Sequence, residues 1–487
     1  MRKRRTIYHN DARHNYLWLF EPPISMEQAW TPVDEVAGTA VDTLSYCVER
    51  GDGAFWPTKV GVRFGADMQP FTSQITWRAW ECMQSLLDRG LDPLQVVIDR
   101  AHDKGLDFIA DLRLSTYGGM DPAHKIGEGG RGWGHEAVRE HQYAVVDELA
   151  RDYALDGFEL DYTAAFDTSN RFYFRTEDLA AGTAMMTDWV RRVAERVRGQ
   201  MPLGARIYPT EAANLDQGLD VRTWLEEGLL DFVIPVLYNY TELDPNMPFR
   251  WVVEPANQAE ASVYGFLQHY VRSELTGAAQ KEYPRAEMFR AAAANYWDWG
   301  VDGLCTYMLD WPLGTEERAM LSEWGDPEQI AGCDKHYVCA RRSEAAVALD
   351  YAHPLPCALA VGAAGCDVPF YLADDLVAMA DRLAGVRLRL YCSNIVSADR
   401  LAVSLNGCSL AGEVCRRVRK SERDGFPHSG PRNFWLDFQL EQIRPVKGDN
   451  VLGVALEGRP AGLGGSVVLQ EVELIIEYSD YPPGLQK

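Results

Sequence analysis

Two carboxylates lie two residues apart in the segment Asp156-Gly-Phe-Glu-Leu-Asp161-Tyr162. If this segment is a β-strand, Glu159 and Asp161 project from one face and the bulky apolar residues project from the other. Two acids on one buried face raise each other's pKa, so one can hold a proton while its neighbour stays charged. The hydrolysis of a glycosidic bond requires that division of labour. In the alternative interpretation, one of the two acids only pairs with an arginine.

Other polar residues follow apolar segments that are also expected to be strands. Asp111 and Arg113 share a face, so they are expected to orient Glu159 or to bind a sugar hydroxyl, and a structural ion pair is an equally good interpretation. Glu211 and Asp310 are candidates for a distant second carboxylate. Aromatic and amide groups suit contacts with sugar rings and hydroxyls, and the candidates of this kind are Tyr238, Asn239 and Trp311.

The first apolar segment ends in a dense polar group, His9-Asn-Asp11-Ala-Arg13-His14. Asp11 and His14 are expected to contact substrate. Two histidines with carboxylates would also suit a divalent ion, with Glu159 as a further ligand. The spacing matches no metal-ligand motif, so we expect neither a metal nor another cofactor.

Eight short apolar segments alternate with amphipathic stretches over residues 1–330, which is typical of repeated βα units. No Gly-x-Gly-x-x-Gly follows the first segments, so a dinucleotide-binding sheet is not expected. The sequence therefore predicts a (β/α)8 barrel, and its C-terminal strand ends would carry the candidate residues. The expected strands are Thr6–Asp11, Thr43–Cys47, Asp107–Leu112, Gly157–Tyr162, Ala205–Tyr208, Phe232–Leu237, Ser262–Leu267 and Gly303–Met308.

Residues 335–487 have strand and turn spacing instead, which predicts a β-sandwich. Asn406-Gly407 between two short apolar segments is a strong hairpin signal. The sandwich is expected to brace the barrel or an oligomer interface, and a homo-oligomer remains open. The expected strands are Ala346–Leu349, Val386–Tyr391, Leu401–Leu405, Phe434–Phe438, Asn450–Leu456 and Val467–Tyr478.

Composition limits the class of partner. The 487-residue chain carries a net charge of −23, which disfavours nucleic acid and anionic membranes as partners. The basic N-terminus is not followed by an apolar segment, so no signal peptide is expected. Ten cysteines lack paired spacing, which favours reduced thiols and a cytoplasmic protein. A cytoplasmic enzyme would act on an oligosaccharide or a glycoside.

Four stretches resemble the family-10-like glycosyl hydrolase proteins, barrel proteins found mostly in bacteria. The stretches are His135–Asp161, Gly218–Asp231, Gly300–Gly303 and Trp324–Glu328. The resemblance implies a barrel enzyme that hydrolyses glycosidic bonds, with Glu159 and Asp161 in its acidic motif. The same segment is similar to the chitinase motif Asp-Gly-x-Asp-x-Asp-x-Glu, but Thr163 stands where that family has its proton donor. The Asn-Glu pair of xylanases is also absent.

These observations favour a glycoside hydrolase with Asp161 as nucleophile or base and Glu159 as proton donor or orienting group. Two alternatives stay open. One is a metal-dependent sugar lyase or isomerase that uses His9, Asp11, His14 and Glu159. The other is a non-catalytic carbohydrate-binding protein on a barrel scaffold.

Overall fold

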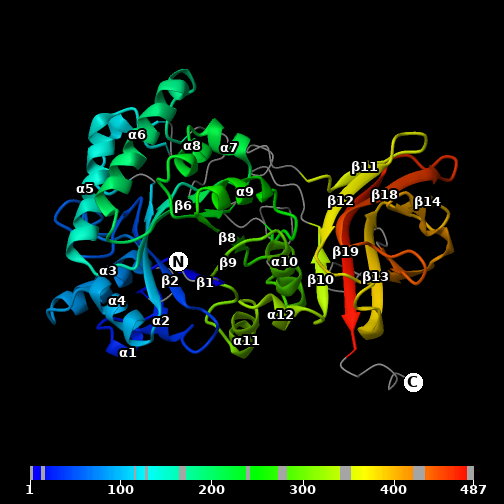
Figure 1. Cartoon of the computed structure of the whole chain (residues 1–487), viewed down its shortest axis with the longest axis horizontal. Coiled ribbons are helices and arrows are strands. Elements are labelled where there is room, and N and C mark those ends of the chain that lie inside the picture. The colour runs from blue at the N-terminus through cyan, green and yellow to red at the C-terminus, as the bar shows by residue number, and fades with distance from the viewer. Residues whose placement is uncertain are drawn as a thin grey trace.

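The computed structural model describes residues 4–12, 17–114, 117–126, 130–163, 172–236, 242–271, 282–339, 353–419 and 434–479, except the side chains of Arg50 and Arg419. A barrel lies beside a smaller all-β domain (Figure 1). Among the described residues, no helix combines the length and the apolar composition that a membrane crossing requires.

Eight parallel strands form the barrel, and β1 pairs with both β2 and β9, which closes it. The short β3 (Gly53–Ala54) extends β2 as an antiparallel hairpin. The (β/α)8 barrel predicted from the sequence is therefore confirmed, although Leu237 of one expected strand lies outside the described residues. The strands are β1 (Arg5–Asn10), β2 (Thr43–Arg50), β4 (Asp107–Arg113), β5 (Gly157–Asp161), β6 (Leu203–Ile207), β7 (Phe232–Pro235), β8 (Ser262–Leu267) and β9 (Gly303–Tyr307).

Helices between the strands cover the outside of the barrel (Figure 1). Local signals set where they begin. Asp92 caps α4 through its carboxylate, which accepts the Leu94 backbone N–H at 2.9 Å, and Pro93 occupies the first turn. The helices are α1 (Met26–Ala29), α2 (Thr31–Asp34), α3 (Gln74–Leu87), α4 (Pro93–Asp103), α5 (Glu136–Asp152), α6 (Leu179–Val197), α7 (Glu211–Asp216), α8 (Val221–Glu226), α9 (Arg250–Gln258), α10 (Ala286–Asp298), α11 (Thr315–Glu323) and α12 (Pro327–Ile330). One-turn 3-10 helices lie at Pro122–His124, Thr176–Asp178, Ala380–Arg382 and Leu410–Gly412.

Two antiparallel sheets form the C-terminal domain and share one apolar core, so the predicted β-sandwich is confirmed. In β12, alternate side chains are buried, as expected for a sheet with one face on the core. One sheet contains β10 (Lys335–Val338), β19 (Val467–Tyr478), β13 (Leu383–Ser393), β17 (Phe434–Gln439), β16 (Val414–Arg419) and β11 (Cys357–Leu359). The other contains β12 (Cys366–Leu372), β18 (Gly448–Gly458), β14 (Arg400–Leu405) and β15 (Cys408–Ser409).

The hairpin expected at Asn406-Gly407 is present. Leu405 of β14 pairs with Cys408 of β15 across the turn. Asn406 has φ 51° and Gly407 has φ 78°, and this left-handed pair of conformations matches the twist of a two-residue hairpin. The expected strand Ala346–Leu349 lies outside the described residues.

The two domains meet where α10 packs against β10 (Figure 1). Asn295 of α10 is fully buried at this junction. Its amide nitrogen donates to the Pro245 carbonyl and to the Tyr371 carbonyl, each at 2.9 Å, and its amide oxygen accepts the Ala373 N–H at 2.9 Å. One side chain of the barrel therefore satisfies backbone groups of both domains.

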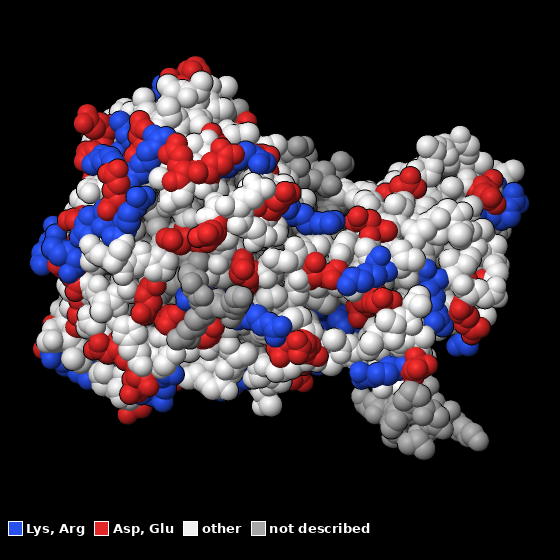
Figure 2. Space-filling model, viewed as in Figure 1, with Lys and Arg blue, Asp and Glu red and all other residues white. Residues whose placement is uncertain are grey.

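Charges of both signs alternate over α5 and α6 on the face shown in Figure 2. Arg192 pairs with Glu140 at 2.5 Å, and Arg196 pairs with Asp147 at 2.5 Å, in both cases across the two helices. This pattern is typical of a solvent-exposed surface with many ion pairs. Each such pair contributes little to the stability of the fold.

Candidate active site

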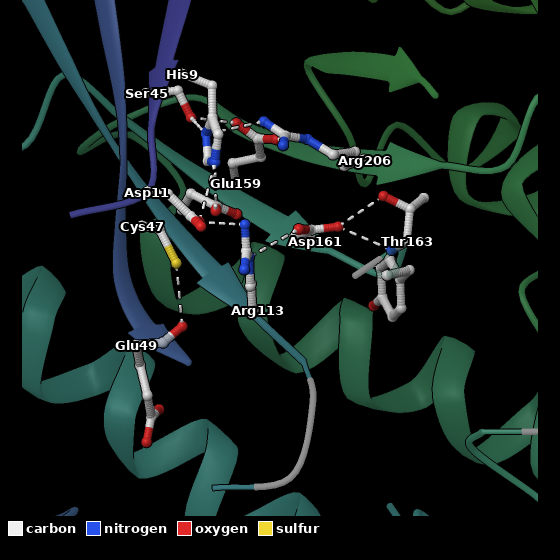
Figure 3. Close-up of polar contacts among 12 residues, drawn as sticks. His9, Asp11, Ser45, Cys47, Glu49, Arg113, Glu159, Asp161, Thr163 and Arg206 are labelled. Carbon is white, nitrogen blue, oxygen red and sulfur yellow. Dashed lines mark hydrogen bonds and ion pairs between the residues drawn. The ribbon is translucent and has the colours of Figure 1, made fainter. Parts of the chain in front are cut away.

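The barrel interior has an apolar half and a polar half. Side chains of β7, β8 and β9 form the apolar half, together with Ile7 and Ile109. The polar half comes from β2, β4, β5 and β6 and from the end of β1, and the members that are labelled in Figure 3 point toward one another. We call it the barrel cluster, and every member is at most 2% exposed. Its members are His9, Asp11, Ser45, Asp111, Arg113, Glu159, Asp161 and Arg206.

The alternation predicted for β5 places both of its acids in this cluster. Glu159 and Asp161 are each 0% exposed and point into the barrel. On the neighbouring strand, Asp111 lies opposite Glu159 and Arg113 lies opposite Asp161. Because parallel strands end together at the C-terminal face of a barrel, these four ionisable groups meet at the place where barrel enzymes carry their chemistry.

Both carboxylate oxygens of Glu159 are engaged. The Arg206 Nε lies 2.6 Å from Oε1, and the Ser45 hydroxyl donates to Oε2 at 2.8 Å. Burial raises the pKa of Glu159, Arg206 opposes that shift, and Asp161 adds to it. A carboxylate held on both oxygens is suited to orienting its neighbours.

His9 is held as a neutral imidazole. Its Nδ1 lies 3.2 Å from Arg206 Nη2 and 3.1 Å from the Ser45 oxygen. Arginine can only donate, so Nδ1 accepts and the ring proton resides on Nε2. Burial, followed by the charge of Arg206, lowers the pKa of His9 to about 3. The Nε2 atom lies 3.8 Å from Asp111 Oδ2 and 3.9 Å from Asp11 Oδ1.

Asp161 is surrounded by groups that stabilise a negative charge. The backbone N–H and the hydroxyl of Thr163 donate to its Oδ1 at 2.8 and 2.9 Å. The Arg113 Nε lies 3.6 Å from Oδ2, and Arg113 also pairs with Asp11. Thr163 stands where the chitinase motif has an acid, and here it serves as a donor to the neighbouring aspartate.

Asp111 is in the opposite situation. Neither of its oxygens has a hydrogen-bond partner among the described residues, and the side chain is 0% exposed. Burial raises its pKa well above the usual range, and the nearby Asp161 and Glu159 add to that shift, while Arg206 and Arg113 oppose it. The raised pKa favours the protonated form of Asp111, and its neighbour Asp161 accepts two hydrogen bonds from Thr163 and lies against Arg113.

Three other candidates make their contacts with residues outside the barrel cluster or are exposed. Glu211 is the first residue of α7, and both its oxygens bind the Arg222 guanidinium, at 2.6 and 3.0 Å. Asp310 is exposed. The indole N–H of Trp311 donates to Glu35 Oε2 at 2.5 Å. The remaining candidates, His14, Tyr238 and Asn239, lie outside the described residues.

Sequence reasoning missed Ser45 and Arg206 as members of the cluster. Both stand on strands that were predicted, and both were visible as polar residues between apolar ones in Leu44-Ser45-Tyr46 and Ala205-Arg206-Ile207. A charged residue inside an expected core strand is itself a signal, since a buried charge requires a partner. For Arg206 that partner is Glu159.

Glu49 is a buried acid that does not belong to the barrel cluster. Its side chain points away from the cluster and toward α5 (Figure 3). It is 1% exposed, and neither of its oxygens has a hydrogen-bond partner among the described residues. Burial raises its pKa from 4.5 to about 8, and the charges of Glu148 and Asp52 add to this shift.

The pKa of Glu49 leads to a test of stability. Between the unfolded value of 4.5 and the folded value of about 8, only the folded protein keeps this proton, so stability falls as pH rises through that window. We expect Glu49→Gln to stabilise the protein by about 2 kcal/mol near pH 9 and to have almost no effect near pH 5. Urea denaturation at both pH values measures the difference. An equal effect at the two values would contradict the raised pKa.

Within the described ranges, no three His, Cys, Asp or Glu side chains converge in a geometry that could hold a metal ion. Two of the four residues of the metal hypothesis, Asp11 and Glu159, are paired with arginines. The fourth ligand of that hypothesis, His14, is not described, so the metal-dependent alternative stays a prediction.

No protein-family model matches the chain, and no curated protein has a similar sequence. Solved structures with a similar fold include an alpha-L-fucosidase isoenzyme from Paenibacillus thiaminolyticus, with 12% identity and a TM-score of 0.43 over 67% of this chain and 49% of that one. An alpha-L-fucosidase from Bacteroides thetaiotaomicron has 11% identity and a TM-score of 0.38, covering 94% and 93%. A chitinase from Bacteroides thetaiotaomicron has 10% identity and a TM-score of 0.39, covering 67% and 98%. This chain thus spans about half the length of the first of these proteins. At such identities and TM-scores, these likenesses transfer neither a substrate nor a catalytic residue to this chain.

Proposed function

We propose that the protein is a glycoside hydrolase that acts on an oligosaccharide or a glycoside in the cytoplasm, of the family-10-like kind that its sequence resembles. The observation that carries the proposal is the contrast between Asp161 and Asp111. Asp161 accepts two hydrogen bonds from Thr163, whereas Asp111 has no hydrogen-bond partner among the described residues and burial raises its pKa well above the usual range. Glycosidases need one carboxyl group of each kind.

In the proposed reaction, Asp111 donates its proton to the oxygen of the leaving group as the glycosidic bond breaks. Asp161 supplies the electron pair, either by attacking the anomeric carbon or by removing a proton from the attacking water. Glu159 acts as the orienting group, because both its oxygens are engaged by Arg206 and Ser45. This assignment moves the donor role from Glu159 to Asp111.

A panel of oligosaccharides and aryl glycosides, assayed with and without EDTA, tests the proposal. We expect release of sugar that EDTA leaves unchanged. Loss of activity in EDTA would favour the metal-dependent lyase or isomerase. Binding of a glycan without turnover would favour the carbohydrate-binding protein.

The role of Asp111 has its own signature. A general acid matters most when the leaving group is poor. We therefore expect Asp111→Asn to lower kcat/KM by about 100-fold or more for an alkyl glycoside, and far less for the matched dinitrophenyl glycoside. Glu49→Gln is the control, because Glu49 is equally buried but points away from the cluster. An equal loss on both substrates would remove Asp111 from the donor role.

A further inference from the structure

The barrel cluster carries more acidic than basic groups. Among the residues that the structure describes, four carboxyl groups face two guanidinium groups, and His9 is neutral. Burial raises the pKa of Asp111 well above its usual range, and with that one group protonated, three carboxylates would still face the two guanidinium groups. Every member is at most 2% exposed, so solvent and salt screen these charges weakly. The carboxyl groups are Asp11, Asp111, Glu159 and Asp161, and the guanidinium groups are Arg113 and Arg206.

Both cations are already committed to carboxylates of the cluster. Arg206 binds Glu159 and donates to His9. Arg113 binds Asp11 and lies against Asp161. Recognition of a sugar carboxylate or phosphate usually uses a guanidinium fork that can turn both its N–H groups to the ligand. An anionic sugar would have to compete with these carboxylates for the two arginines.

We infer that this site selects glycosides whose reacting sugar is uncharged or cationic, and that it rejects uronides and sugar phosphates. The inference rests on the proposed hydrolase function and adds the substrate class. An anionic group placed in the cluster would meet an excess of like charge in a buried setting, and such a juxtaposition is costly. The same excess favours the positive charge that develops on the sugar ring when a glycosidic bond breaks.

Matched pairs of para-nitrophenyl glycosides test this inference. Each pair, such as a glucoside with its glucuronide or a galactoside with its galacturonide, has one anomer and differs only in the carboxylate. In any pair that is turned over, we expect kcat/KM to be about 100-fold or more higher for the uncharged member. Equal or faster turnover of the uronide would overturn the inference and leave the hydrolase function standing.

If no member of any pair is turned over, the hydrolase proposal fails, and the charge selectivity is then tested by binding alone. NMR titration with a methyl glycoside and with the matched uronide shows which of the two ligands binds. Binding of the uncharged member alone supports the inference. Binding of the uronide, or of neither ligand, overturns it.

Two isosteric substitutions test whether the excess negative charge causes the preference for the uncharged member of each pair. Asp11→Asn removes a carboxylate and releases Arg113, so we expect the preference for the uncharged member to shrink by about tenfold or more. Asp111→Asn replaces a carboxyl group whose pKa burial raises well above its usual range, so the preference should change less than in Asp11→Asn, by under about threefold. The comparison uses the ratio of the two substrates, which a general loss of activity does not alter. Equal shifts in both variants would contradict a charge effect.

Discussion

Asp161→Asn is expected to lower kcat by about 1,000-fold while the fold remains intact, which is within the range for loss of a positioned catalytic acid or base. Asparagine has nearly the same shape as aspartate, so the packing around residue 161 is unchanged. It lacks the charge that Asp161 uses to supply an electron pair. It also presents an N–H group to the donors of Thr163 or of Arg113.

The matched experiment compares Asp161→Asn with Glu49→Gln and Thr163→Val. Circular dichroism and the melting temperature establish that each variant folds. Thr163→Val removes one of the two donors to Asp161 and keeps the backbone N–H, so we expect a loss of about tenfold. Full activity of Asp161→Asn on a substrate that the wild type cleaves would exclude Asp161 from the chemistry.

Arg206→Met is expected to produce the largest loss of stability, about 3–5 kcal/mol, because it leaves Glu159 buried without its cation. The guanidinium is 0% exposed, binds Glu159 at 2.6 Å and lies 5.5 Å from the centre of the Phe266 ring. Methionine fills a similar volume, so the loss should come mainly from the uncompensated carboxylate.

A double-mutant cycle separates charge from packing. Arg206→Met combined with Glu159→Gln removes both charges, and we expect the double variant to regain most of the stability that Arg206→Met loses. Urea denaturation at pH 7 gives the four free energies of unfolding. If the two losses simply added, Arg206 would stabilise the barrel by packing and not by neutralising Glu159.

Much of this architecture could be predicted because the alternation of apolar residues is strong. The face of β5 that carries Glu159 and Asp161 follows from that alternation alone, and the structure agrees. Glu49 shows where the rule fails. Strict alternation would place it with Ser45 and Cys47 inside the barrel, but the pairing of β2 with β4 shifts register between Cys47 and Glu49. The bulge turns Glu49 toward α5, and no short-range signal in the sequence marks it.

The residues that pair with these acids were harder to predict from the sequence. Arg206 stands on β6, which pairs directly with β5 in a register that sets Arg206 opposite Asp161. The pattern of either strand alone does not show that the guanidinium reaches Glu159. Glu211 follows a strand end as a catalytic residue would, but α7 begins there at once, and the side chain meets Arg222 of α8. Strand positions can thus be predicted from local pattern, whereas the direction of a loop residue depends on the helix that follows.

The buried amide of Asn295 has a consequence for how the molecule unfolds. Its three hydrogen bonds join α10 to backbone groups before and after the domain junction, and the nearby Asn246 oxygen accepts the Tyr371 N–H at 2.6 Å. Separation of the domains would break these hydrogen bonds together with the ion pair between Lys447 and Asp298 across the same junction. Barrel and sandwich should therefore melt together, as one cooperative transition in a calorimeter, and a barrel cut free of its sandwich should aggregate more readily than it refolds.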